Sequence, residues 1–264
     1  MEIFWRLLLG HIIADFTLQT NFIAGWKRRS KWGLFVHCAI HPIIYSLLLW
    51  QYLSLVWIRI GSLELTGCTC VFLVFVTHVI EDEWRIWSVL KQGAPDDTFF
   101  YVWDQLIHYA IIFAFSPVVD GMQGKFGLFY YPPIPGVVSH WEGMGLGLGE
   151  AFRTISKNET WVFVALLFAA VTHFTTVTIY FIEKDLFGVP FPSTREKYIS
   201  MLERLAVTVC FLLPGIWWAA VAGVWIIRSI LYKLYRWGDF SWIHILLGNG
   251  IAILCGIIIR NLVY

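Results

Sequence analysis

The sequence has few charged residues. Asp, Glu, Lys and Arg make up 14% of the 264 residues, whereas soluble proteins carry about a quarter. Together with 58% hydrophobic residues and a mean hydropathy of +0.68, this scarcity argues against a soluble domain. Neither sign of charge is in excess, because 19 Lys and Arg accompany 18 Asp and Glu, so we expect no nucleic-acid partner. The five cysteines form no CxxC pair, so no disulfide framework or thiolate metal site is predicted.

Seven apolar stretches approach or exceed the length of about 20 residues that a helix needs to cross a bilayer. They cover residues 3–25, 33–58, 67–90, 99–119, 160–182, 204–230 and 240–262. The first stretch is interrupted by polar residues, so we expect six or seven spans. The predicted fold is an all-α, polytopic transmembrane helical bundle. Its expected partner is the lipid bilayer. The chain then divides into a four-span half (1–119), an outer-face loop rich in Pro, Gly and aromatic residues (120–159) and a three-span half (160–264).

Basic residues in short loops indicate the orientation of the chain, since such loops tend to stay on the cytoplasmic side. The loop after the first stretch contains Lys27, Arg28, Arg29 and Lys31. We therefore place this loop inside and the N-terminus outside.

Polar residues recur at intervals of four positions in the first four stretches, an interval that puts them on one face of a helix. They are His11, Asp15 and Gln19; His37 and His41; His78 and Asp82; and Asp104, Gln105 and His108. Counted at 1.5 Å per residue from the basic or acidic ends of these stretches, most of these groups lie about 10 to 20 Å along their helices. A shared layer of polar groups in the cytoplasmic half of the membrane is predicted.

Imidazole and carboxylate groups without thiolate are typical ligands of zinc, iron or manganese. We predict a divalent metal, zinc before iron or manganese, bound by His11, His37, His41, His78 and His108. Asp15, Asp82 and Asp104 are the candidate catalytic groups, as ligands, orienting partners or a general base. Gln19, Gln105 and, from the fifth stretch, His173 are expected to support the site. Two alternatives stay open: hydrogen bonding between helices, and tetrapyrrole ligation, against which the carboxylates argue.

The motifs GHIIADFTLQT, HCAIH, THVIED and DQLIH resemble a bacterial membrane family known as domain of unknown function 3307. The resemblance implies a bacterial inner-membrane location and no established activity. The sequence departs from the family pattern at EDEWRIW (81–87), where a shorter acidic and then basic pattern is expected. The pattern matches His11, Asp15, Gln19, His37, His41, His78, Asp82, Asp104, Gln105 and His108.

The sequence also has a distant similarity to membrane-bound metal-dependent hydrolases, which carry His and Asp on successive helices. This similarity implies a metal-dependent hydrolase acting on an amphiphilic phosphoester or amide. A second hypothesis is a non-catalytic subunit of a larger membrane complex, with other membrane proteins or pigments as partners. Ion or proton transport through the polar layer is the third hypothesis.

Overall fold

A computed structural model of the chain describes residues 2–117, 119–120, 125–126, 160–213, 215, 217–235 and 241–263. The chain divides into two compact units, 1–132 and 133–264. The described elements are helices apart from two short hairpins, which confirms the all-α class. Most of the predicted outer loop 120–159, including its Pro-rich and Gly-rich motifs, lies outside the described residues.

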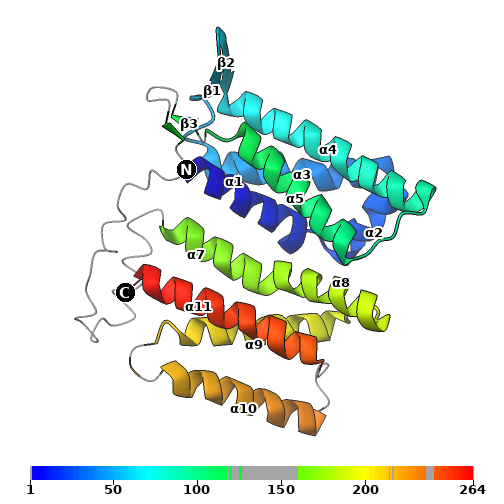
Figure 1. Ribbon diagram of the computed structural model, residues 1–264, viewed down its shortest axis with the longest axis vertical. Helices are drawn as coiled ribbons and strands as arrows, with labels where there is room; N and C mark the ends of the chain where they lie inside the picture. Colours follow the sequence, from blue (N-terminus) through cyan, green and yellow to red (C-terminus); the bar gives the residue numbers. More distant parts are fainter. Residues whose placement is uncertain are drawn as a thin grey trace. The chain divides into compact units, whose positions relative to one another are not determined.

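Four long helical segments of the first unit pack in a closed ring. They are α1 (Glu2–Ile12), continued by the π-helix η1 (Ile13–Thr17), then α3 (Lys31–Leu49), α4 (Gly67–Gln92) and α5 (Thr98–Phe115). α1 packs against α3 and α5, and α4 contacts these same two helices (Figure 1). The hairpin of β1 (Val56–Ile60) and β2 (Leu63–Thr66) connects α3 to α4, and β3 (Val119–Asp120) pairs with β4 (Lys125–Phe126). The ring gives its four helices one shared interior.

The first predicted span is not one straight helix. After η1 the chain breaks, and α2 (Asn21–Arg29) runs at 87° to the preceding helix. Thr20 caps α2, since its hydroxyl accepts a hydrogen bond from the amide of Ile23, and Ser30 caps α3 in the same way. The depths counted from Lys27 along a straight first helix are therefore wrong, because Lys27 lies on a segment that turns across the end of the ring.

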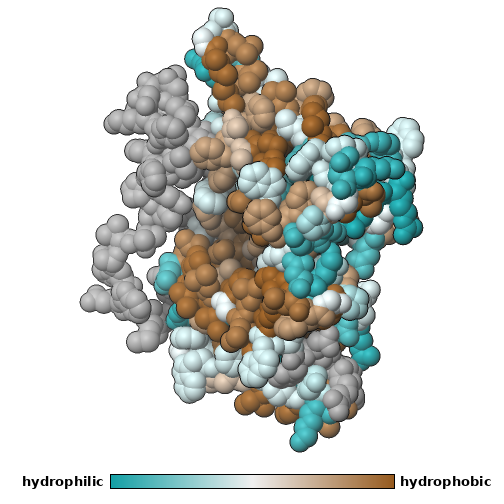
Figure 2. Space-filling model, turned by 45° about the vertical axis from the view of Figure 1, so that its right-hand side comes forward, coloured by the Kyte–Doolittle hydropathy of each residue, from teal (hydrophilic) through white to brown (hydrophobic). Residues whose placement is uncertain are grey.

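The exposed faces of the ring helices are apolar, and their interior has a polar part beside an apolar part that includes Leu7, Val74 and Ile112. On α3, Ile43 and Leu47 are 60% and 69% exposed, whereas His37 and His41 are fully buried. On α5, Phe99 and Leu106 are exposed, and the polar residues face the interior. In Figure 2 the hydrophilic residues of this unit gather at the end where α2 and the α4–α5 connection lie. This distribution is the reverse of a soluble helix bundle.

The second unit contains two long helices with π-helical segments. The first comprises α7 (Thr160–Ala169), η3 (Ala170–Phe174) and α8 (Thr175–Phe187), and the second comprises η4 (His244–Gly248) and α11 (Asn249–Val263). α9 (Thr194–Cys210) packs against both, and α10 (Trp217–Tyr235) packs on α9 (Figure 1). The predicted span 204–230 is wrong as a single helix, because α9 ends at Cys210 and α10 begins at Trp217.

Four described helices are long and apolar enough to cross a membrane, and the bent pair that includes η1 and α2 raises the number to five. The four are Lys31–Leu49, Thr98–Phe115, Thr160–Phe187 and His244–Val263. The expected seven spans are not confirmed. α4 is the longest of the ring helices, with 26 residues, but it carries Glu81, Asp82, Glu83 and Arg85 in its second half.

Candidate metal centre

Five imidazole rings meet in the interior of the ring of helices. The rings of His41 and His78 have centroids 3.9 Å apart, and those of His78 and His108 are stacked at 4.2 Å. His11 lies 5.1 Å from His108 and 5.6 Å from His41, and His37 lies 5.4 Å from His41. Each of these residues is at most 2% exposed. The five rings come from α1, α3, α4 and α5, because each of these helices turns one polar face toward the interior.

Four carboxylates enter the same interior. The Asp15 Oδ1 and Asp82 Oδ2 atoms lie 3.0 Å and 3.2 Å from His37 Nε2. Glu81 Oε2 lies 2.7 Å from His108 Nε2. Asp104 lies within 3.9 Å of His108 and accepts a hydrogen bond from the Gln105 amide. All four carboxylates are buried, with at most 7% of each residue exposed.

Several buried ligand atoms in this cluster have no hydrogen-bond partner. They include both ring nitrogens of His41, Nε2 of His78, Oδ1 of Asp104 and Oε1 of Glu81. Buried polar groups are usually satisfied, and each one left unsatisfied costs about 1–3 kcal/mol. Nitrogen and oxygen atoms that converge in this way without hydrogen-bond partners are suited to binding a cation.

Groups of these side chains bring their ligand atoms within 4.8 Å of one another and could hold a metal ion. The groups are His11, His41 and His78; Asp15, His37 and His78; Cys38, His78 and Asp82; and Glu81, Asp82, Asp104 and His108. Imidazole and carboxylate dominate these sets, as expected for zinc, iron or manganese. The structure thus brings together side chains that could hold a metal ion, and these side chains do not by themselves identify the metal.

Two predicted supporting residues lie outside the four helical segments of the ring. Gln19 follows η1 at the break in the chain, so it does not continue the helical face of His11 and Asp15. His173 belongs to η3 in the second unit, where its Nδ1 lies 3.1 Å from the hydroxyl of Thr172. Gln105, by contrast, connects the cluster: its oxygen lies 3.3 Å from His11 Nε2, and its amide donates to Asp15.

Two cationic side chains that were not predicted in the site, Lys27 and Arg85, contact the cluster. Lys27 donates to both oxygens of Asp82, at 3.2 and 3.3 Å, and its Nζ lies 3.1 Å from His37 Nε2. Arg85 donates to Asp104 at 2.9 Å. In the sequence, Lys27 belongs to a run of basic residues, and this run predicted a loop at the membrane surface. The pattern therefore gave no indication that Lys27 contacts the buried cluster.

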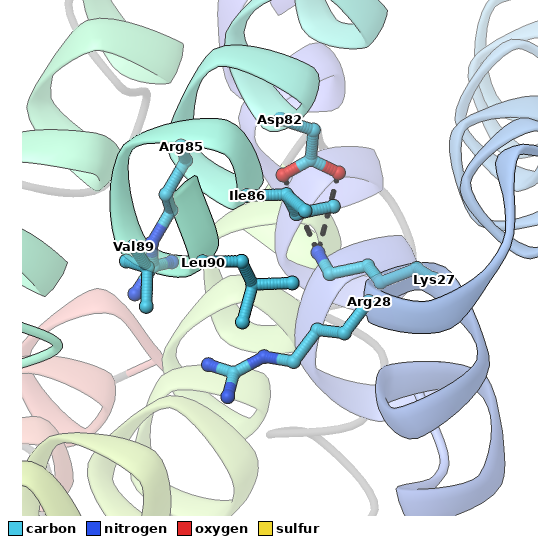
Figure 3. Close-up of a pocket in the computed structure, with 7 residues that line it drawn as sticks. All are labelled: Lys27, Arg28, Asp82, Arg85, Ile86, Val89 and Leu90. Atoms are coloured by element: carbon cyan, nitrogen blue, oxygen red, sulfur yellow. Dashed lines mark hydrogen bonds and ion pairs between the residues drawn. The ribbon is translucent and has the colours of Figure 1, made fainter. Parts of the chain in front are cut away.

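A small pocket opens where these cations meet the cluster. Figure 3 shows the Lys27 side chain reaching the Asp82 carboxylate, with Arg28 beside it and Arg85 at the opposite side of the pocket. The pocket is lined by Lys27, Arg28, Asp82, Arg85, Ile86, Val89 and Leu90. Asp82 is therefore shared by the pocket and by the buried cluster.

The fold and the cluster define a helical protein with apolar outer faces and a buried His and carboxylate centre. Residues 3–128 match a family described as Protein of unknown function (DUF3307), and this segment is a domain of that family. The match contains all four motifs of the cluster and ends before the second unit. No curated protein and no solved structure matches the chain.

Proposed function

We propose that the first unit holds a divalent metal ion inside the membrane and hydrolyses an amphiphilic substrate that enters from the cytoplasmic leaflet. The observation that carries the proposal is the convergence of buried imidazole and carboxylate atoms without hydrogen-bond partners. Zinc is the first candidate and iron or manganese the alternatives, because most of the available donors are imidazole and carboxylate, with one thiol, Cys38, among them.

The distribution of residues on the ring supports a membrane location. Trp32 and Trp50 flank α3 and are 72% and 71% exposed. Their 18-residue separation corresponds to about 27 Å of helix, close to the hydrocarbon thickness of a bilayer. Exposed tryptophan favours the boundary between acyl chains and headgroups. The basic end with Lys27 and Arg28 is assigned to the cytoplasm, which leaves the N-terminus outside the inner membrane of a bacterial cell.

The side chains of the cluster divide into ligands and proton carriers. His11, His41 and His78 converge closely and are assigned as ligands, with His37 and His108 at the edges of the same set. When bound, a divalent ion supplies Lewis acidity for hydrolysis. Asp82 and Asp104 lie toward the pocket, and each is held by a cation, Lys27 or Arg85 respectively. We assign the transfer of a proton to or from the substrate to these carboxylates, with Asp15 orienting His37.

Metal analysis of the purified full chain tests the proposal. Protein extracted in mild detergent and supplied with zinc is expected to retain at least one ion per chain, measured by mass spectrometry. His41→Gln and His78→Gln are expected to lose most of this metal, because they remove central donors. His244→Gln, in the second unit, is the matched control and should keep the wild-type content. Size-exclusion profiles establish that each variant is folded.

Two results would overturn the assignment. One is wild-type protein that holds no stoichiometric zinc, iron or manganese. The other is a folded His41→Gln, His78→Gln double variant with the full metal content.

Proton transfer through the cluster is a second candidate, supported by the close succession of His41, His78, His108 and Glu81. The ring centroids are 3.9 and 4.2 Å apart, and the last imidazole lies 2.7 Å from Glu81. Liposomes containing the protein would then show a proton flux that metal removal does not abolish. A flux equal to that of protein-free liposomes would exclude this candidate.

A further inference from the structure

The pocket at the basic end of the first unit has a composition suited to an anionic amphiphile. Three of its lining residues are cations, Lys27, Arg28 and Arg85, and only Asp82 is acidic. The remaining lining residues are aliphatic: Ile86, Val89 and Leu90. A charged group and an apolar chain would each find matching side chains there.

The cations of the pocket are already held in place. Asp96 accepts from Arg28 at 2.7 Å and from Arg85 at 3.3 Å, so it fixes the two guanidinium groups on one side of the opening. Arg85 also binds Asp104, and Lys27 binds Asp82. Guanidinium groups present several donors in a fixed plane and match the oxygens of a phosphate. Arg28 remains 47% exposed in its side chain, so it is accessible from the surface.

The aliphatic part of the pocket continues onto the outer face of α4. Leu90 is 55% exposed, and the neighbouring Trp87 is 47% exposed. An acyl chain attached to a headgroup in the pocket could therefore lie along α4 without entering the polar interior. Asp82 places the headgroup next to the buried cluster, since the same carboxylate belongs to a group of potential metal ligands.

We infer that this pocket binds the phosphate headgroup of an anionic amphiphile and holds it beside Asp82. The inference rests on the proposed function in one respect, that the bound amphiphile is the substrate of the metal centre. The chemistry selects a phosphomonoester headgroup over a neutral or zwitterionic one, because the exposed Arg28 donates to Asp96 through one guanidinium nitrogen and can donate to a phosphate through the others.

Binding of short-chain lipids to the full chain in detergent tests this inference. Dihexanoyl phosphatidic acid is the probe, and dihexanoyl phosphatidylcholine and inorganic phosphate are the comparisons, all titrated by calorimetry. The Kd for phosphatidic acid is expected to be at least about tenfold lower than for either comparison, from charge-assisted hydrogen bonds and apolar contact together. Phosphate binding as tightly as phosphatidic acid would overturn the assignment of an amphiphile.

Arg28→Gln is expected to raise the Kd for phosphatidic acid about tenfold, because it removes one charged donor from the pocket. Lys31→Gln is the matched control. Its side chain is 79% exposed, pairs with Glu83 and lies outside the pocket. Equal affinity of wild type for the two lipids, or an unchanged Kd in folded Arg28→Gln, would overturn the inference.

Metal content measured on the same samples separates this inference from the proposed function. Protein that holds metal but does not discriminate the lipids contradicts only the pocket assignment. Protein that discriminates the lipids but holds no metal contradicts only the metal-dependent function.

Discussion

Replacing Lys27 with Met is expected to tighten zinc binding, because the lysine ammonium occupies a position suited to a metal ion. Its Nζ lies 3.1 Å from His37 Nε2 and 3.2 and 3.3 Å from the two oxygens of Asp82. His37 and Asp82 each belong to a group of potential metal ligands. Lys27 thus neutralises Asp82 in the absence of a metal and repels a divalent ion that approaches the same atoms.

The size of the effect follows from the distances. An ammonium and a divalent ion about 4 Å apart repel each other by about 8 kcal/mol at an effective dielectric constant of 20. The Lys27 side chain is 13% exposed and can withdraw toward water, so only part of this repulsion opposes the bound ion. Retaining about a sixth of it corresponds to about 1.4 kcal/mol, or a tenfold change in Kd. We therefore expect Lys27→Met to lower the Kd for zinc by at least about tenfold.

A competition titration against a fluorescent zinc chelator measures this change on detergent-purified protein. Lys31→Met provides the control, because it removes the same charge from a side chain that is 79% exposed and pairs with Glu83. Its Kd should equal that of the wild type. If folded Lys27→Met binds zinc no more tightly than wild type does, the ammonium does not compete with the metal, and this reasoning about the centre is refuted.

Three further predictions concern stability. Removal of metal by a chelator should lower the unfolding temperature, since an ion at about 100 times its Kd contributes about 2.7 kcal/mol; an unchanged temperature would contradict a bound structural ion. Gly33→Ala should destabilise by about 1–3 kcal/mol, because a Cβ there would lie 2.5 Å from the Trp26 backbone. Gly25→Ala, with no atom within 4 Å of its Cβ, is the control in the same thermal assay and should stabilise by up to about 1 kcal/mol, because alanine favours the helix. Arg204→Met should destabilise by about 3 kcal/mol, since the buried guanidinium binds two backbone carbonyls of η3; the exposed Arg195→Met should change the melting temperature little.

The spacing of polar residues was sufficient to find the imidazoles that α3, α4 and α5 bring together. His37 and His41 differ by four positions, so the regular helix α3 presents both to one interior. The periodicity of an α-helix is a local property, and the sequence contains it in full. The same argument selected His78 on α4 and His108 on α5.

The path of the chain after Asp15 could not be predicted in this way. Hydropathy predicts one span over 3–25 that polar residues interrupt, but the interruption does not specify the π-helical turn η1 or the 87° bend that follows. The bend carries Lys27 back to Asp82, 55 positions along the chain. Long-range contacts of this kind depend on tertiary packing, so residue spacing alone does not determine them.

The formal charge of the buried cluster bears on both the proposed metal ion and the proposed membrane location. Asp15, Glu81, Asp82 and Asp104 bring four negative charges into the cluster, while Lys27 and Arg85 bring two positive charges. With neutral imidazoles, two negative charges remain uncompensated, and uncompensated charge at membrane depth costs several kcal/mol. Two imidazolium ions would balance this charge, because His37 Nε2 lies 3.0 and 3.2 Å from Asp15 and Asp82, and His108 Nε2 lies 2.7 Å from Glu81. One divalent ion among neutral imidazoles balances it equally, so the proposed metal-bound cluster and a doubly protonated cluster are the two charge-balanced states of this interior.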